Sequence, residues 1–319
     1  MTPARVLRAD ALLLFVALIW GVGFVVQKSA MAGEDSIGPV TFAAVRLLIG
    51  GLVLVPLLVL DRRLRPKRLA TRKQQCVAVG LAGVLLAAGG ILQQWGLVYT
   101  DAGVAAFLTG LYVVLVPMLG LLIGYRVRSS TWIAAVLAMV GMYLLSVAGQ
   151  PTINPGNLLV LGSAVCWAGQ VLVIGWIASS MGPIALATGQ NLVGGVLAVG
   201  VAIVVETTTW AQLVDVAWAL AYSGPLAIGL GFLLQIMAQR DAPPAHTAIV
   251  LSMEAVFGAI AGWMMLHEAF TPTMLVGCAI VLCAMGVAQC RPPKQMKGLR
   301  SSKDESRKSS VGGRKSNAG

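Results

Sequence analysis

The chain has 319 residues, of which 58% are hydrophobic and only 11% are charged, and its mean hydropathy is +0.85. Soluble domains are about half apolar and a quarter charged, so this composition excludes an ordinary soluble protein and predicts one embedded in a membrane. The formal net charge of +11 is compatible with a nucleic-acid partner. We expect none, because the placement of the basic residues has a simpler explanation in membrane topology.

Long apolar segments follow one another along the chain, with gaps that are too short to fold as soluble domains. Each segment approaches the roughly 20 residues that a helix needs to cross a bilayer. The sequence therefore predicts an all-α integral membrane protein with ten transmembrane helices, over residues 10–28, 39–60, 76–97, 102–123, 131–148, 158–177, 184–205, 217–238, 246–265 and 272–289.

The lysines and arginines, apart from Lys28 and Arg46, fall in alternate loops or at the two ends of the chain. By the positive-inside rule this distribution predicts a protein of the inner (cell) membrane with both termini in the cytoplasm. The basic tail, residues 291–319, has few apolar side chains and is expected to be disordered, and it could touch anionic membrane lipid. A cleavable signal peptide is the alternative interpretation of the first apolar segment.

An internal repeat argues against that alternative. The run GPVTFAAVRLLIGG begins at Gly38, and GPIALATGQNLVGG begins 144 residues later at Gly182. Asp10 and Trp20 in the first segment correspond to Asn157 and Trp167 in the sixth, at an offset of 147. Removing the first segment would leave its counterpart unmatched, so we expect it to be retained.

The repeat unit contains five predicted spans, and an odd number forces the two copies to cross the membrane in opposite directions. This is the inverted-topology arrangement of many secondary transporters. The predicted organisation is a cytoplasmic N-terminus (1–9), a first five-helix repeat (10–148), an external linker (149–157), a second five-helix repeat (158–290) and the tail (291–319).

Two charged residues lie well inside predicted spans, where a charge costs at least about 2.5 kcal/mol on insertion scales. Arg46 is seven residues past Pro39, about 10 Å into the membrane. It could contact a substrate carboxylate or act as a gate, pair structurally, or extend to the outer interface. Glu254 could couple transport to protons, bind a cation or form a packing hydrogen bond. The two could also pair with each other.

Polar and aromatic side chains inside the spans are the candidates for a substrate cavity. Glutamines offer both donors and acceptors without a buried charge, and two tryptophans lie ten residues into their spans, away from the interfaces. The candidate residues are Trp20, Gln93, Gln94, Tyr112, Trp167, Gln170, Asn191, Gln235 and Ser252. His246, after two prolines, is expected at the cytoplasmic rim.

Two G-x-x-x-G pairs recur in the fourth and ninth spans, at an offset of 138. Glycines four residues apart allow helix backbones to approach closely. We expect the pairs to pack against each other or against a second subunit, which leaves a homodimer open. They are Gly120 with Gly124 and Gly258 with Gly262.

Several of these features together resemble the EamA-like transporters of the drug/metabolite transporter superfamily. They are Trp20-Gly21, Arg46, the run QQWGLVYTDAGVAAFLTGLYVVLVPMLG, and LSMEAVFGAIAG followed by Leu266-His267-Glu268. The resemblance covers roughly residues 10–289. Two positions depart from the family pattern: Ala255 replaces a proline, which puts a kink there in doubt, and His267 replaces a glycine.

The resemblance implies a ten-helix carrier with a cavity between two five-helix halves, often an exporter of amino acids or related metabolites. We expect a small amino-acid-like or drug-like substrate, export by alternating access, and neither cofactor nor metal; proton coupling stays open. A membrane-embedded enzyme is disfavoured, because no catalytic motif is present and the two histidines fall at opposite faces. A channel or sensor remains an alternative. The five cysteines have no metal or disulfide spacing.

Overall fold

The computed structural model describes residues 3–33, 36–64, 69–125, 127–146, 155–266 and 271–289. The predicted tail, most of the predicted linker 149–157 and the His267-Glu268 pair lie outside these ranges. Within them every regular element is a helix. The prediction of an all-α membrane protein is thereby confirmed.

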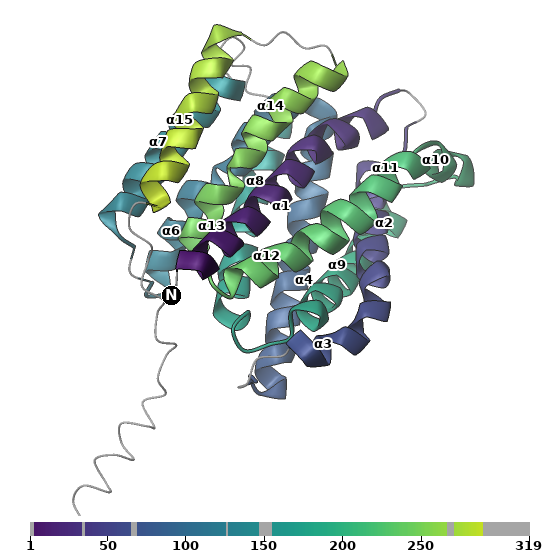
Figure 1. The fold of residues 1–319 in the computed structure, drawn as a ribbon. Helices are drawn as coiled ribbons and strands as arrows, with labels where there is room; N and C mark the ends of the chain where they lie inside the picture. Colours follow the sequence, from purple (N-terminus) through teal and green to yellow (C-terminus); the bar gives the residue numbers. More distant parts are fainter. Residues whose placement is uncertain are drawn as a thin grey trace, which may run out of the picture.

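The helices of the first repeat occupy the five predicted spans in order (Figure 1). The second and fourth spans are each composed of more than one helix. The elements are α1 (Pro3–Ala30), α2 (Pro39–Leu54), η1 (Val55–Leu57), α3 (Leu58–Leu64), α4 (Arg72–Tyr99), α5 (Ala102–Gly110), α6 (Tyr112–Leu122) and α7 (Ser129–Ser146).

The second repeat follows the same plan, with one short additional helix, α10, between its second and third spans. Its third span contains the π-helical stretch η2. The elements are α8 (Pro155–Ile177), α9 (Pro183–Val205), α10 (Trp210–Asp215), α11 (Ala217–Tyr222), η2 (Ser223–Leu230), α12 (Gly231–Gln239), α13 (Pro244–Leu251), α14 (Met253–Leu266) and α15 (Pro272–Gln289).

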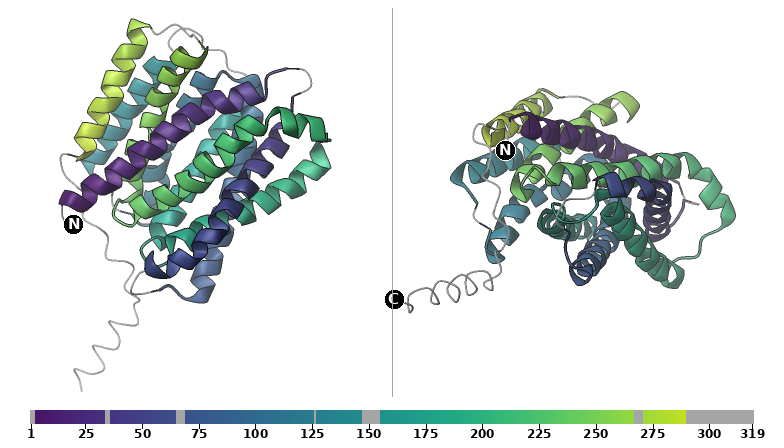
Figure 2. Two further views of the ribbon diagram at one scale, coloured as in Figure 1. Left: turned by 45° about the vertical axis from the view of Figure 1, so that its right-hand side comes forward. Right: turned by 60° about the horizontal axis from the view of Figure 1, so that its bottom comes forward.

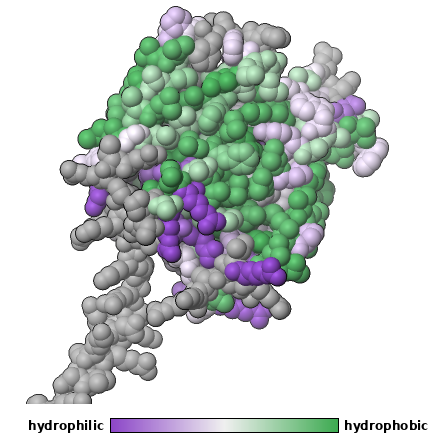
Figure 3. All heavy atoms as spheres, viewed as in Figure 1, coloured by the Kyte–Doolittle hydropathy of each residue, from purple (hydrophilic) through white to green (hydrophobic). Residues whose placement is uncertain are grey.

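Eight of these spans are long and apolar enough to cross a membrane. The fifth and tenth predicted spans correspond to α7 and α15, whose apolar parts, Ser129–Leu144 and Pro272–Ala288, are shorter. The exact count of ten crossings therefore stays a prediction. The face in Figure 3 is a broad apolar surface with hydrophilic residues toward its lower edge, as expected where lipid replaces water around a helix bundle.

The two repeats begin at opposite ends of the bundle. At the end where α1 finishes, the Lys28 ammonium donates to the carbonyl oxygens of Leu97 and Thr100, at 2.8 and 3.0 Å. At that same end the Thr100 hydroxyl donates to Asn157 Oδ1 at 2.9 Å, near the start of α8. We call this end the linker face and the end where α1 begins the N-terminal face. This is the placement that an inverted repeat requires.

The contacts between helices follow the same pattern in the two repeats. α2 lies along α9 and α7 lies along α15, so each of these pairs joins a span to its own counterpart (Figures 1 and 2). α1 packs on α14 and α12, and its counterpart α8 packs on the equivalent spans of the first repeat, α5–α6 and α4. The structure thus has the internal pseudo-symmetry that the repeated sequence predicts.

Individual side-chain contacts between α2 and α9 are also equivalent in the two repeats. A Cβ atom added to Gly51 would lie 2.7 Å from the Leu192 side chain, and one added to Gly195 would lie 2.7 Å from the Leu48 side chain. Both pairs are related by the same offset of 144. The repeated glycines let a leucine of the other repeat approach the helix backbone.

Two carboxylates join the repeats at opposite ends of the α2–α9 pair. The Glu206 carboxylate, just past α9, accepts the backbone N–H groups of Val40 and Thr41 at 2.9 and 2.7 Å, at the start of α2. Asp61 in α3 accepts the N–H groups of Ile184 and Ala185 at 3.2 and 3.3 Å, at the start of α9. Each carboxylate satisfies free N–H groups and interacts favourably with the helix dipole.

The repeated Gly-Pro motif is explained by these caps. Proline suits the first turn of a helix, because the N–H it lacks would have no partner inside the helix. The glycine before it leaves room for the carboxylate: an added Cβ would lie 2.2 Å from Glu206 Oε2 at Gly38 and 2.1 Å from Asp61 Oδ2 at Gly182.

The fourth and ninth spans break at matching points. α5 ends before Leu111 and α13 ends before Ser252, and both residues have φ −60° and ψ −13°. In each span a second helix, α6 or α14, starts directly afterwards. Discontinuous helices of this kind place helix ends near the middle of a membrane protein, where transporters bind their substrates.

The expected packing of the two G-x-x-x-G pairs against each other was wrong. Gly124 lies beyond α6 in a turn with φ +86°, and an added Cβ there would meet nothing within 4 Å. Gly258 instead packs against Gly21 of α1, whose own added Cβ would lie 2.8 Å from Gly258 N. Gly124 serves a left-handed turn, which favours glycine for conformational reasons.

Candidate functional site

A partly open cavity lies between the two repeats, with an empty volume of about 600 Å³ that includes space open to solvent. It is bounded by α1, α2, α4, α5 and α6 from the first copy and by α8, η2, α12, α13 and α14 from the second. The lining residues are Trp20, Gly23, Phe24, Gln27, Arg46, Gln93, Thr109, Tyr112, Trp167, Gln170, Val171, Ala227, Ile228, Phe232, Gln235, Leu251 and Glu254.

Three aromatic rings form one wall of this cavity. Trp20 and Trp167, the paired residues of the repeat, both contact Phe232, with ring centroids 5.1 and 6.2 Å from it. The Trp20 indole N–H donates to the Ala227 carbonyl oxygen at 2.9 Å. The Trp167 indole N–H is buried and has no acceptor among the described residues. The wall therefore combines a large apolar surface with one available donor.

The positive charge of the cavity is Arg46, which is only 3% exposed. Its Nη1 donates to the Gln27 side-chain oxygen, and its guanidinium carbon lies 5.9 Å from the centre of the Phe42 ring. The Nε–H group has no acceptor within the described part of the chain. Arg46 thus faces a cavity rather than extending to the interface, and it retains an unused donor.

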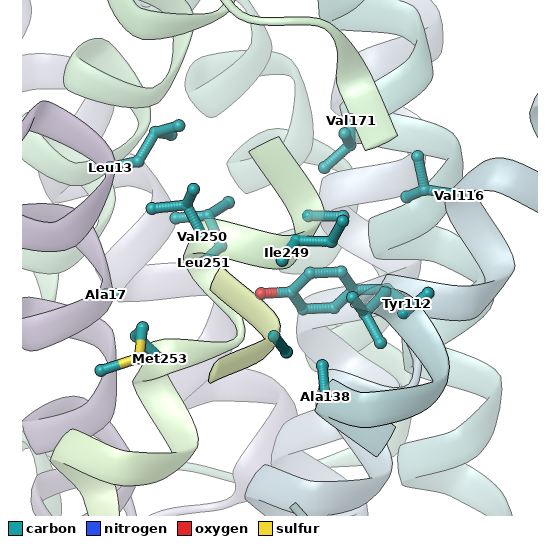
Figure 4. Close-up of a cluster of buried hydrophobic side chains, with 14 of the residues drawn as sticks. Leu13, Ala17, Tyr112, Val116, Ala138, Val171, Ile249, Val250, Leu251 and Met253 are labelled. Atoms are coloured by element: carbon teal, nitrogen blue, oxygen red, sulfur yellow. The ribbon is translucent and has the colours of Figure 1, made fainter. Parts of the chain in front are cut away.

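The negative group of the cavity is Glu254, in the first turn of α14. Its carboxylate accepts the hydroxyl of Tyr112, the first residue of α6, at 3.0 Å. Figure 4 shows the Tyr112 ring beside Ile249, with its hydroxyl pointing toward the side on which Leu251 lies. The two broken spans are therefore connected at their break points. Among the described residues Glu254 makes no ion pair with Arg46.

Amide side chains from both repeats line the cavity. Gln93 Nε2 donates to the Thr109 hydroxyl at 3.2 Å, and Gln235 Nε2 donates to Gln170 Oε1 at 3.3 Å. Gln235 Nε2 also lies 3.2 Å from Gln239 Oε1. Gln170 Nε2 and Gln235 Oε1 are buried without partners in the described structure. They leave one donor and one acceptor for a solute.

The structure brings together at the cavity six of the nine predicted lining residues and both predicted charges. The six are Trp20, Gln93, Tyr112, Trp167, Gln170 and Gln235, and the charges are Arg46 and Glu254.

The other three candidates are buried elsewhere. Gln94 donates to the sulfur of Met31 at 2.9 Å, Asn191 lies 3.5 Å from the Ile228 carbonyl oxygen, and the Ser252 hydroxyl donates to Ile249 O at 2.7 Å. Adjacent helical residues point about 100° apart, so Gln94 cannot share the direction of Gln93. None of the three lines the cavity.

Sequence reasoning missed several lining residues that helical spacing could have found. Gln27 is seven residues after Trp20, two turns along the same face of α1. Thr109 precedes Tyr112 by three residues, and Phe232 precedes Gln235 by three. Periodicity identifies residues that share a face once one member of that face is known.

Comparison with known proteins agrees with the double architecture. The sequence profile of the EamA-like transporter family matches residues 7–147 and again residues 154–288. A solved crystal structure has the same fold, with a TM-score of 0.69 at 18% identity over 88% of this chain and 96% of that one. The family profile thus matches the chain twice, once over each repeat.

Curated relatives are transporters by name. A protein described as an uncharacterized transporter from Archaeoglobus fulgidus is 31% identical over 286 residues, covering 89% of this chain and 87% of the relative. The threonine/homoserine exporter RhtA of Escherichia coli is 27% identical over 258 residues, covering 78% of this chain and 82% of RhtA. With the family profile matched along nearly the whole membrane region, the chain belongs to the EamA-like transporter family of the drug/metabolite transporter superfamily.

Proposed function

We propose that this protein is a secondary carrier that exports a small amino-acid-like or drug-like solute by alternating access. The observation that carries the proposal is the cavity between the two inverted repeats, which is lined by a guanidinium, a carboxylate and an aromatic wall. Ligand sites are mostly apolar cavities with a few placed polar groups. The name of the relative RhtA, an exporter of threonine and homoserine, supports the amino-acid-like class and the direction.

The symmetry of the cavity lining supports alternating access. Each repeat contributes a tryptophan, a glutamine and a broken span to the cavity. If the repeats exchange their conformations, the solute stays near the middle of the bundle while the open path moves from one face to the other. The basic loops favour the N-terminal face as the cytoplasmic one, and with it an inner-membrane location.

The two charged residues take different roles in this proposal. Arg46 presents an unused Nε–H group, and a guanidinium binds carboxylates strongly through paired N–H groups. Glu254, hydrogen-bonded to Tyr112, is suited to hold the ammonium group of a solute or to exchange a proton with it. A zwitterionic solute of modest size would complement both groups.

The experiment is counterflow in proteoliposomes that contain the purified protein. Vesicles loaded with a mixture of unlabelled amino acids should accumulate a labelled amino acid transiently, with saturation at high concentration. Saturation distinguishes a carrier from a channel. Arg46→Gln introduces the residue that the second repeat has at its equivalent position, Gln190, and should lower uptake of carboxylated solutes by at least about tenfold, because hydrogen bonds to charged groups are worth about 1.5–3 kcal/mol.

A matched control is Gln190→Ala, since Gln190 is buried and does not line the cavity. It should retain counterflow when rates are normalised to folded protein. The proposal is contradicted if no amino acid, amine or drug-like cation shows saturable exchange, or if Arg46→Gln transports carboxylated solutes at the wild-type rate.

A further inference from the structure

Two polar contacts lie between the cavity and the two ends of the bundle. Near the N-terminal face, His246 Nε2 lies 2.6 Å from Asp10 Oδ1, and both side chains are almost fully buried. Near the linker face, the Thr100 hydroxyl donates to Asn157 Oδ1 at 2.9 Å, and Thr100 is 2% exposed. None of the four residues lines the cavity.

The repeat relates these two contacts to each other. Asp10 and Asn157 occupy equivalent positions, each ten residues before the tryptophan that its span contributes to the cavity wall. Ten residues of helix span about 15 Å. Asp10 therefore lies between the aromatic wall and the N-terminal face, and Asn157 lies between it and the linker face.

The partners of Asp10 and Asn157 both lie near the turn between the third and fourth spans of a repeat. His246 belongs to α13, the half-helix that leads to the break at Ser252. Thr100 is the last residue before the turn into α5, the half-helix that leads to the break at Leu111. His246 thus joins α1 to the start of α13, and Thr100 joins α8 to the turn from which α5 begins.

We propose that Asp10–His246 and Thr100–Asn157 are the two gates of the cavity, which open alternately. Opening toward one face requires a half-helix to swing away from its neighbour about the break, and the polar contact at that face is the bond that must be lost. The residue at the break of a discontinuous span can act as a hinge, because its backbone angles can change while both half-helices stay intact. The inference rests on the proposed alternating access and assigns positioning roles to four residues that touch no solute.

The surroundings of each contact are compatible with helices that separate there and pack together again. A small second cavity lies beside the first contact and is lined by Val6, Ala9, Asp10, Asp241, Ala242, Pro243 and His246. The Nδ1 atom of His246 has no partner in the described chain, so a single hydrogen bond fixes the ring. At the other face the Lys28 ammonium also holds the α4 end through the Leu97 and Thr100 carbonyl oxygens.

The test is the accessibility of one cysteine in the cavity from each face separately. Gly23 lines the cavity, and its added Cβ would lie 3.5 Å or more from any neighbour, so the Cβ of Gly23→Cys fits without a clash. The background carries alanine at the five native cysteines. A charged, membrane-impermeant thiol reagent is added to one side of oriented vesicles, and the rate of modification is measured.

Asp10→Ala should raise the rate of modification from the N-terminal face by about tenfold and lower the rate from the linker face. The factor reflects the loss of a hydrogen bond to a charged group. Thr100→Val should do the opposite, by a smaller factor of about three, because a hydrogen bond between uncharged groups is weaker. His246→Leu and Asn157→Leu test the same contacts from their other sides, so the test survives if one variant fails to fold.

Opposite changes in the modification rate at the two faces distinguish the opening of one gate from a general loss of packing in the bundle. A variant that merely unfolds the bundle would raise the rate from both faces, and this result, like unchanged rates in both pairs of variants, would overturn the inference. Asp241→Ala is the control, since Asp241 lines the same small cavity without bonding to His246. Its rates of thiol modification should stay within twofold of those of Gly23→Cys protein in which both contacts are intact. Because labelling requires no solute, the absence of transport would refute the proposed function while leaving this measurement valid.

Discussion

At the scale of single residues, the helical phase decides which polar side chains serve the cavity. Gln93 and Gln94 are adjacent in α4 and chemically identical, yet Gln93 lines the cavity and Gln94 lies against Met31. The difference is the rotation of about 100° between neighbouring helical residues. The pair therefore offers a matched comparison of a solute contact with a packing contact.

Replacing each glutamine by alanine should separate these two roles. Gln93→Ala is expected to lower the rate of counterflow severalfold with little change in thermal unfolding, because the lost amide faces the cavity. Gln94→Ala should lower the unfolding temperature, since it leaves a void in a packed region, and it should leave transport per folded molecule nearly unchanged. The reverse result would place Gln94 in the solute path.

Glu254 provides a second test at this scale. If its carboxylate takes up and releases a proton during the cycle, Glu254→Gln should abolish the dependence of counterflow and net efflux on pH. Tyr112→Phe removes only the hydroxyl that donates to Glu254, so it should retain a pH-dependent profile. Rates measured between pH 5 and 9 check this; a Glu254→Gln profile that matches the wild type would eliminate the coupling role.

At the scale of helices, α2 and α9 form an interlocked pair. Each helix start is capped by a carboxylate from beyond the end of the other helix, and each contributes a glycine that admits the cap. The two caps lie at opposite ends of the pair. This arrangement ties the repeats together where a span meets its own counterpart, so we expect α2 and α9 to move as one body.

The interlock predicts the effect of adding a methyl group. Gly38→Ala and Gly182→Ala should each destabilise the protein by about 1–2 kcal/mol, the usual cost of losing a helix cap, because the new Cβ displaces the carboxylate. Gly200→Ala is the control: it lies within α9 with nothing near its added Cβ, and alanine favours a helix over glycine. Thermal unfolding in detergent would measure all three.

A double-mutant cycle tests the cause of this destabilisation. Once Glu206 is replaced by alanine, the further change Gly38→Ala should cost much less than it does alone, since the carboxylate that it displaces is gone. Additive costs for the two substitutions would indicate that the clash with Glu206 is not the reason that glycine is needed at position 38.

At the scale of the whole molecule, the inversion of the repeats depends on an odd number of crossings in each. α7 and α15 have shorter apolar parts than the other spans, yet the start of α8 lies at the end of the bundle where α1 finishes. Five crossings in the first repeat, with α7 among them, agree with that placement.

Reporter fusions can check this topology directly. A reporter placed after residue 150 should lie on the opposite side of the membrane from one at the N-terminus, while a reporter at the C-terminus should return to the N-terminal side. Fusions of alkaline phosphatase and of a fluorescent protein at each point provide complementary readouts. Finding the reporter after residue 150 on the N-terminal side would remove α7 as a crossing and the inverted arrangement with it.

Much of the architecture was accessible from the sequence because the membrane imposes strong and local rules. A backbone in lipid has to satisfy its own hydrogen bonds, so each long apolar run predicts a helix. The duplication appears as repeated lettering at offsets of 144 and 147, and parity then determines the orientation of the second copy. These inferences require no knowledge of which helices touch.

The interior was less accessible, since it depends on contacts between residues far apart in the chain. Nothing in the sequence around Gly38 and Pro39 indicates that Glu206 caps α2, a contact across more than 160 positions. The fate of Arg46 was open in the same way, because snorkelling, pairing with Glu254 and facing a cavity are all compatible with one arginine in an apolar run.

By itself the sequence determined the class of protein, its helices and its duplication, because these follow from local hydrophobicity and periodicity, and it predicted the inversion from an odd count of spans. Only the tertiary structure decided which polar side chains share the cavity, where the fourth and ninth spans break, and which carboxylate reaches which helix. Those outcomes depend on the rotation of each helix against its neighbours, and that rotation is set by the packing of the whole bundle.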